Sequence, residues 1–430
     1  MKRTFALPVI ALAAITGPAA AGIAGGGGAQ SAPVQTLSTG AAVSGEITFW
    51  HAYSAAGSEI KVLEKTIIPN FEKLHPGVKI KPVQVPDADM HQKLVTASAA
   101  GSLPDVIRVD IVTVPELAKI GVLTPLDEAM PDFQDWAKKM YPGPLATNKY
   151  KDKYWGLPLD TNTKVVLYNQ DALKSAGISS VPKTLEELKA NAGKAGGGKF
   201  ILAEGGSAAW QMLPYIWSNG GDMTDPGVTK ASGYLNGPKS VAALQMLVDM
   251  YGQKTIPGNV LGGSGGTPTA DGLAKGTYAS IVDGPWTFPN LATSYPKFQA
   301  QTSPMYSGEG GSVSVVGGED IVMTQQSKNK ELAAEFIRYM LSPDAQKAMG
   351  HAGQLSAEAD MASEMSAVEP YYAAYLEQLK TAKPRPATPQ WAKIDDIFTK
   401  QAQLAFQGKQ TVQQAMDAAA AQIDPLLAQG

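Results

Sequence analysis

The stretch EITFW at residues 46–50, followed by SEIKVLEKTIIPNFEKLHPG at 58–77 and VKIKPVQV at 78–85, decides the fold class of this chain. The outer two segments alternate polar and apolar residues, which is typical of β-strands. The middle segment has apolar residues at helical spacing, namely Ile60, Leu63, Ile67 and Phe71. A strand, a helix and a second strand in this order predict a βαβ unit with parallel strands.

Predicted strands and helices continue to alternate along the chain. Further strands are predicted at 105–110 (DVIRVD), 164–168 and 277–283 (TYASIVD), and helices are predicted between and after them. Strands that alternate with helices predict an α/β protein whose helices cover a parallel sheet. The chain has 430 residues, which is long for one hydrophobic core, so two lobes are expected.

Charge and composition exclude some classes of protein. The chain has 36 Lys and Arg against 39 Asp and Glu, a formal charge of −3. That balance does not attract a phosphate backbone, so no nucleic-acid partner is expected. With 44% hydrophobic and 17% charged residues the chain is globular rather than disordered.

The N-terminal 21 residues predict a secretion signal. A basic start, a short apolar run and the small residues AAA at 19–21 fit a cleavable leader. Residues 22–45 are mostly Gly, Ala, Ser and Thr, which predicts a flexible segment, with order beginning at Glu46. The leader therefore predicts an exported protein, periplasmic or extracellular, and because the chain has no cysteine, no lipid anchor is expected.

The candidate motifs for catalysis or cofactor binding lack the flanking elements or the spacing that such sites need. GGSGG at 262–266 has the spacing of a hydrolase nucleophile elbow but lacks the strand before it and the helix after it. The four histidines have no metal-ligand spacing, and no Walker or Rossmann glycine pattern is present. The sequence therefore favours a non-enzymatic protein, with no cofactor and no metal expected.

Eight segments, in order, resemble family 1 extracellular solute-binding proteins of bacterial ABC importers, the group that includes maltodextrin and other oligosaccharide binders. They are EITFWHAYSAAGSE (46–59), PDVIRVDIVTVPELAKIGVLTPLDE (104–128), YWGLPLDTNTKVVLYNQDALKSAG (154–177), VPKTLEELKANA (181–192), DGPWTFPN (283–290), VVGGEDIVM (315–323), NKELAAEFIRYMLSPDAQKAM (329–349) and GKQTVQQAMDAAAAQID (408–424). Each segment alone is a weak signal, but their order makes the resemblance strong.

The resemblance implies a type II-like periplasmic-binding-protein fold with two α/β lobes that close on a ligand in the cleft between them. By analogy, residues 46–160 and 303–340 form lobe I, and residues 161–302 and 341–430 form lobe II. It also implies partners in the membrane, namely the permease subunits of an ABC importer with its ATPase. A monomer is expected.

The resemblance further implies ligand contacts at matching positions. These are Tyr53, Ser54, Asp110, Asp160, Asn162, Trp210, Trp286, Gly317, Gly318, Glu319 and Arg385. The three residues from Gly317 to Glu319 are expected to form a turn that faces the cleft. The set suits a sugar, because aromatic faces receive the apolar C–H face of a sugar ring. Polar and charged side chains bind its hydroxyls.

Structural alternatives stand beside these assignments. Trp210 could belong to a core, Asp160 could cap a turn, and Arg385 could be a surface charge. Trp286 follows the turn Asp283-Gly284-Pro285, where water should reach it, unless it packs under its loop with Phe288.

The expected ligand is an oligosaccharide, with maltooligosaccharide first. A polyol phosphate such as glycerol 3-phosphate is the alternative within the same class. An exported glycoside hydrolase would need two carboxylates facing each other across a cleft, and the sequence nominates no such pair. A scaffold or adhesion protein with a degenerate cleft is a third possibility.

Overall fold

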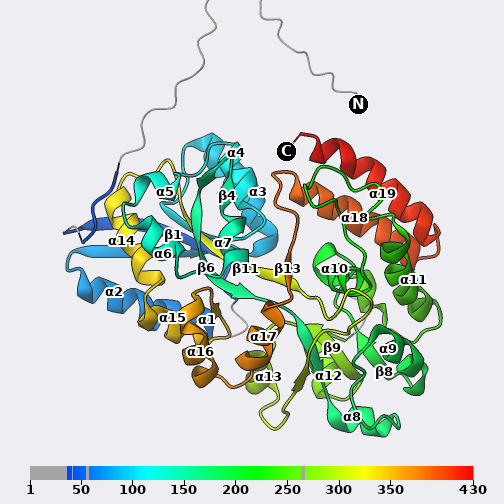
Figure 1. Cartoon of the computed structure of the whole chain (residues 1–430). Helices are drawn as coiled ribbons and strands as arrows, with labels where there is room; N and C mark the ends of the chain where they lie inside the picture. Colours follow the sequence, from blue (N-terminus) through cyan, green and yellow to red (C-terminus); the bar gives the residue numbers. More distant parts are fainter. Residues whose placement is uncertain (1–35, 41, 55–57, 263–266, 430) are drawn as a thin grey trace, which may run out of the picture. The chain divides into compact units, whose positions relative to one another are not determined.

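Figure 1 shows the computed structural model, which describes residues 36–40, 42–54, 58–262 and 267–429. The predicted secretion signal, most of the predicted leader and all but the first residue of the 262–266 loop lie outside the described residues.

One sheet has seven strands in the order β12-β6-β11-β3-β1-β2, and β13 pairs with β11 off this path. Its strands are β1 (Gly45–His51), β2 (Val78–Gln84), β3 (Val106–Asp110), β6 (Gly156–Asn162), β11 (Val315–Met323), β12 (Leu355–Ser356) and β13 (Lys383–Pro384). β1 pairs in parallel with both β2 and β3, which confirms the predicted βαβ unit. β11 runs antiparallel to β3 and β6, so the sheet is mixed rather than all parallel.

A second sheet has four strands in the order β10-β7-β9-β8. They are β7 (Val165–Tyr168), β8 (Phe200–Ala203), β9 (Tyr278–Asp283) and β10 (Gln301–Ser303). Only Thr163 and Lys164 separate β6 of the first sheet from β7 of the second. The chain therefore crosses from one sheet to the other at this link.

Helices cover both sheets. On the first sheet's side are α1 (Glu59–Val62), the π-helical η1 (Leu63–Ile67), α2 (Ile68–Leu74), α3 (Asp87–Ala100), α4 (Val114–Lys119), α5 (Leu126–Ala129), α6 (Phe133–Ala137), α7 (Pro142–Thr147), α14 (Lys330–Met340) and α15 (Pro343–Gly350). On the second sheet's side are α8 (Gln170–Ser175), α9 (Leu185–Asn191), α10 (Ala209–Ser218), α11 (Pro238–Gly252), α12 (Thr269–Ala274), α13 (Thr287–Ser294), α18 (Trp391–Phe406) and α19 (Val412–Leu427).

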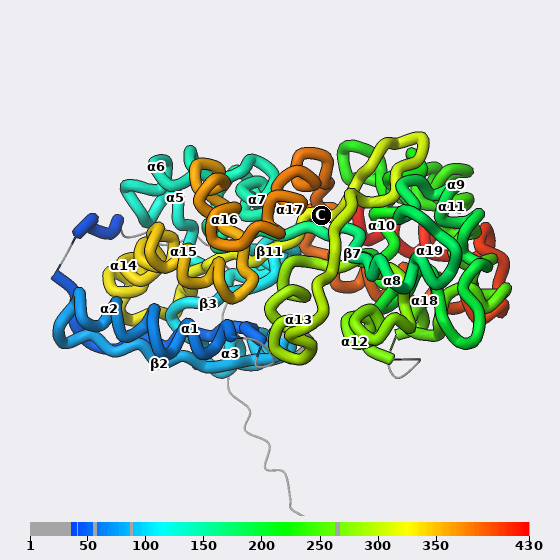
Figure 2. The backbone as a smooth tube through the Cα atoms, turned by 90° about the horizontal axis from the view of Figure 1, so that it is seen from below, coloured from blue at the N-terminus to red at the C-terminus, as the bar shows by residue number. Residues whose placement is uncertain are grey.

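The remaining elements are short. They are β4 (Lys149–Tyr150), β5 (Lys153–Tyr154), η2 (Ala192–Lys194), η3 (Gly258–Leu261), η4 (Ala359–Met361), α16 (Ala362–Val368) and α17 (Tyr372–Leu379). In Figure 2, β11 and β7 run in the middle, with α14 and α15 to one side and α10 and α19 to the other.

Each sheet has its own hydrophobic core, which makes the fold two-lobed. Phe49 of β1 packs with Phe336 of α14 in the first core. Val166 of β7 shares the second core with Tyr215 of α10 and Phe398 of α18. Buried apolar area is the main stabilising term in folding, so each lobe has its own source of stability.

Two parts of the chain pack differently from the sequence prediction. Leu37, in the predicted leader, is only 1% exposed and belongs to the first core. Its N–H donates to the carbonyl of Ala129 at 2.7 Å, so order begins before Glu46. Leu341 and Met349 also pack in the first core, whereas the sequence assigned residues from 341 onward to the second lobe.

In the part of the chain that the structure describes, no helix combines the length and the apolar character needed to cross a bilayer.

Candidate ligand-binding site

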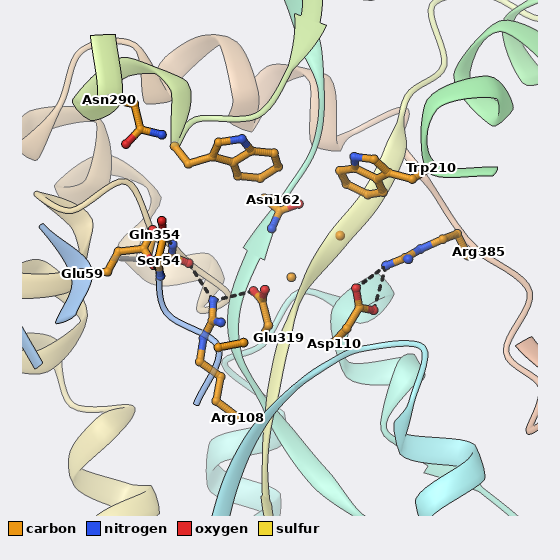
Figure 3. Close-up of a pocket in the computed structure, with 14 residues that line it drawn as sticks. Ser54, Glu59, Arg108, Asp110, Asn162, Trp210, Asn290, Glu319, Gln354 and Arg385 are labelled. Atoms are coloured by element: carbon orange, nitrogen blue, oxygen red, sulfur yellow. Dashed lines mark hydrogen bonds and ion pairs between the residues drawn. The ribbon is translucent and has the colours of Figure 1, made fainter. Parts of the chain in front are cut away.

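A cavity of about 410 Å³ lies at the ends of β3, β6 and β11, facing α10 and the start of α13 (Figure 3). All the predicted site residues line it except Tyr53 and Asp160. The structure therefore brings together residues from opposite ends of the chain, from Ser54 to Arg385. Their contact with a ligand stays a prediction.

Tyr53 and Asp160 lie behind the cavity wall rather than on it. Both are buried. Arg108 covers the Tyr53 ring, with its Cζ 4.2 Å from the ring centroid. Asp160 lies within β6 and accepts from Nε and Nη2 of Arg108 at 3.3 and 3.1 Å. It therefore pairs with a buried cation and does not cap a turn.

Arg108, which the sequence reasoning missed, is the centre of this wall. It lies on β3 and is 3% exposed. Its Nη2 is 2.7 Å from Oε2 of Glu319 and donates to Oε1 of Gln354 at 3.1 Å. A buried charge is costly unless it is paired and hydrogen-bonded. An arginine between Ile107 and Val109 in an apolar strand was the signal that could have identified it.

Glu59 and Gln354 extend the polar wall, and neither was predicted. Oε2 of Glu59 accepts from the N–H of Ser54 at 2.7 Å, and Oε1 accepts from Nε2 of Gln354 at 3.0 Å. Burial raises the pKa of Glu59, against the nearby Arg108 charge. Burial likewise raises the pKa of Glu319 well above its usual range, with Arg108 again opposing the rise.

Arg385 closes the other end of the cavity. Its Nη2 donates to both carboxylate oxygens of Asp110, at 2.9 and 3.3 Å (Figure 3). Arg385 is 8% exposed, so the surface-charge alternative is wrong. Its Cζ lies 5.2 Å from the centroid of the Trp210 ring, within the range of a cation–π contact.

The two tryptophans lie side by side. Their ring centroids are 6.4 Å apart and their planes meet at 32°. Trp210 packs on the edge of the second core and also lines the cavity, so the core alternative is met in part, and contact of this residue with a ligand stays a prediction. Phe288 stacks on Tyr371 with centroids 4.2 Å apart, whereas Trp286 lines the cavity. The alternative in which Trp286 packs with Phe288 is therefore wrong.

Glycines make room for both indoles. A Cβ on Gly317 would lie 2.6 Å from Cη2 of Trp210, and one on Gly284 would lie 2.2 Å from Cη2 of Trp286. Real Cβ atoms do not approach other heavy atoms so closely. Each ring thus rests directly on a stretch of backbone without a side chain.

The segment from Gly317 to Glu319 faces the cavity as expected, but the prediction of a turn is wrong. It lies inside strand β11, where Gly317 pairs with Asn162 and Glu319 with Asp160, and the register shifts after Glu319. Gly318 has a φ of +132°, and a Cβ there would be 2.4 Å from the Asp160 carbonyl oxygen. An irregular glycine-rich strand therefore replaces the expected turn.

Two buried polar atoms on the cavity wall have neither a hydrogen bond nor an ion-pair contact among the described residues. They are Oδ1 of Asn162 and Nε of Arg385; a third buried polar atom, Oε2 of Glu319, has the ion-pair contact with Arg108 but no hydrogen bond. A buried polar group without a partner is costly, so such atoms point to a ligand or to water. Across the described residues no group of three or more His, Cys, Asp or Glu side chains could hold a metal ion.

Comparison with known proteins places this chain among proteins of the same fold. The galactooligosaccharide-binding protein of Bacillus subtilis (strain 168) is 25% identical over 387 residues, 85% of this chain and 89% of that protein. The sn-glycerol-3-phosphate-binding periplasmic protein UgpB of Pectobacterium atrosepticum is 24% identical over 431 residues, 91% of this chain and 93% of that protein.

Among solved structures, the GacH receptor of Streptomyces glaucescens, which was solved unliganded and in complex with acarbose, superposes with a TM-score of 0.81. It is 24% identical, and the match covers 90% of this chain and 99% of that one. The family model for bacterial extracellular solute-binding proteins matches residues 55–347. On these grounds, this chain belongs to the family of bacterial extracellular solute-binding proteins.

Proposed function

We propose that this protein is the sugar-binding component of an ABC importer and that its ligand is an oligosaccharide. One observation supports this most directly: the Trp210–Trp286 pair lines the same cavity as the unpartnered Oδ1 of Asn162 and Nε of Arg385. A sugar offers an apolar C–H face to an aromatic ring and a rim of hydroxyls to such polar atoms.

The size and lining of the cavity support a small ligand. Its volume of about 410 Å³ falls within the 300–1,000 Å³ that is usual for small-molecule sites. The relatives named for galactooligosaccharide and studied with acarbose support an oligosaccharide rather than a single sugar. Maltooligosaccharide remains the first candidate.

The charges near the cavity favour a neutral ligand over a phosphate ester. Glu59, Asp110 and Glu319 line it, with Asp160 just behind. Arg108 is already paired with Glu319, and Arg385 with Asp110. A phosphate carries about two negative charges, and it would have to displace these carboxylates or lie beside them at a Coulombic cost.

The protein acts without turnover in this proposal, and its two lobes close on the ligand. The crossing between β6 and β7 and the strand β11 are the connections that would bend. A ligand held between lobes stabilises the closed form by its differential affinity. The exported protein then presents the loaded form to permease subunits in the membrane, and it works as a monomer.

Calorimetry tests the proposal. The wild-type protein is titrated with a series of maltooligosaccharides and galactooligosaccharides and with glycerol 3-phosphate. We expect saturable heat with at least one oligosaccharide and none with glycerol 3-phosphate. Binding of glycerol 3-phosphate alone, or of nothing in the series, would overturn it. Chromatography of the bound sugar after long incubation should show no new reducing ends.

A further inference from the structure

A second group of charges lies outside the cavity lining, near the ring of Trp210. Lys164, in the link between β6 and β7, is 2% exposed, and Glu204, which follows β8, is 1% exposed. Nζ of Lys164 lies 3.6 Å from Oε2 of Glu204. The other oxygen of Glu204 accepts from the hydroxyl of Tyr215 at 2.5 Å.

The backbone of Lys164 is held firmly at the crossing between the sheets. Its N–H donates to Oγ of Ser314 at 3.3 Å, and the same hydroxyl donates to the Lys164 carbonyl at 2.7 Å. The neighbouring Thr163 donates from its hydroxyl to the Val315 carbonyl at 2.8 Å. The lysine side chain therefore starts from a well-defined point on the second lobe's side of the crossing.

Stability alone does not account for a buried lysine at this place. Lysine is almost never fully buried unless it is paired. Well-packed apolar residues in place of a buried ion pair are often as stable or more stable. An ion pair kept in a core of Val166, Ile201 and Tyr215 therefore calls for another role.

The contacts of Lys164 point to that role, because its ammonium reaches the Trp210 ring, which lies beside the Trp286 ring. Its Nζ lies 5.9 Å from the centroid of the Trp210 ring, within the range of a cation–π contact, which is strongest when desolvated. Burial raises the pKa of the Asp283 carboxyl. The Lys164 charge opposes that rise, and so do hydrogen bonds to the carboxyl, one of them from the Trp286 side chain. Asp283 ends β9, three residues before Trp286.

We propose that Lys164 is a positioning residue for the ligand site: it holds the ring of Trp210, and through that ring the neighbouring Trp286, while Glu204 holds the lysine. The effect on sugar affinity rests on the proposed function, whereas the effect on the two rings does not. One buried ammonium would thus set the mutual angle of the tryptophan pair before any ligand arrives, which is preorganisation of the site.

The test follows the environment of each tryptophan ring by NMR. The indole N–H resonances of the seven tryptophans are recorded in ligand-free protein labelled with ¹⁵N and assigned from single Trp→Phe variants. We expect Lys164→Met to shift the resonances of Trp210 and Trp286 and to leave those of the distant Trp50 and Trp136 in place. It should also weaken oligosaccharide binding at least tenfold.

The chain offers a matched control. Nζ of Lys383 lies 5.9 Å from the ring of Trp217, but this lysine is half exposed and Trp217 does not line the cavity. Lys383→Met should leave the resonances of Trp210 and Trp286 and the sugar affinity unchanged. A folded Lys164→Met protein in which Trp210 and Trp286 do not shift would overturn the inference, as would an equal effect from the control.

A second variant covers the case in which Lys164→Met does not fold. Lys164→Met combined with Glu204→Gln removes both charges and leaves no unpaired carboxylate beside the missing lysine. We expect this double variant to fold with Trp210 and Trp286 still displaced, and undisturbed indole resonances would overturn the inference. If wild-type protein binds no sugar while the lysine variants move both rings, the proposed function fails and the positioning role stands.

Discussion

Asp110 and Arg385, 275 residues apart in the chain, form an ion pair in which one guanidinium nitrogen reaches both carboxylate oxygens, at 2.9 and 3.3 Å. Asp110 ends β3 of the first sheet, and Arg385 follows β13 and lies over Trp210 of α10. The pair therefore connects the first lobe with an aromatic wall of the second. It fixes one end of the cavity and one of the two tryptophans.

Asp110→Asn should weaken sugar binding about tenfold, because Arg385 loses the charge that holds it over Trp210. Truncating one partner of a buried charge pair costs about 2–5 kcal/mol, and the partial exposure of Asp110 reduces this to about 1–2 kcal/mol. Calorimetry measures the change in affinity. Glu377→Gln breaks the exposed Lys380–Glu377 pair and should leave affinity unchanged, so equal losses in the two variants would contradict the prediction.

Trp286→Ala should leave the thermal stability of the ligand-free protein almost unchanged and raise the dissociation constant roughly thirtyfold, about 2 kcal/mol. The indole is half-buried against Gly284 and lines the cavity, so few core contacts are lost. Trp217→Ala is the matched control. This tryptophan is a buried member of the second core, and its removal should cost about 3–5 kcal/mol of stability. A large loss of stability in Trp286→Ala with normal affinity would make it a core residue.

Gly317→Ala should impair binding more than stability. The added methyl would lie 2.2 Å from Oδ1 of Asn162 and 2.6 Å from the Trp210 ring. Both side chains face the cavity, so they can give way into it and lose the geometry that a ligand needs. Calorimetry and thermal denaturation separate the two effects. Gly143→Ala, in α7 with nothing within 4 Å of the new Cβ, should change neither property appreciably. Wild-type affinity in Gly317→Ala would show that these side chains do not contact the ligand.

Glu358 makes stability depend on pH. Burial raises the pKa of this carboxyl to about 7, against the opposing charge of Lys139. The folded state binds this proton more tightly than the unfolded state, so the stabilisation is fully present below about pH 4.5 and is lost as pH rises through 7. Glu358→Gln should therefore gain stability relative to wild type between pH 5 and pH 8, measured by urea denaturation. A constant difference between the two proteins across that range would show that the carboxyl is not the cause.

Much of the architecture followed from local pattern. Alternation with period two identified the strands at 46–50 and 78–85, and helical spacing identified the segment between them, because side-chain direction repeats with the backbone. The predicted site residues fell largely at strand ends and helix starts, which is why most of them line one cavity. Tyr53, just past β1, and Asp160, within β6, were placed on the correct segments, but both are buried against Arg108 behind the cavity wall.

The partners of the buried charges were decided by tertiary structure alone. Arg108 meets Gln354 across 246 residues, and Lys164 meets Glu204 and the Trp210 ring only because the link between β6 and β7 lies close to the end of β8 and to α10. The hydrophobic pattern of a segment indicates which face of a helix or strand is buried. It does not indicate which distant side chain packs against that face. That choice depends on strand order and register, and so on the packing of the whole chain, which also replaced the expected turn at Gly317 by an irregular strand.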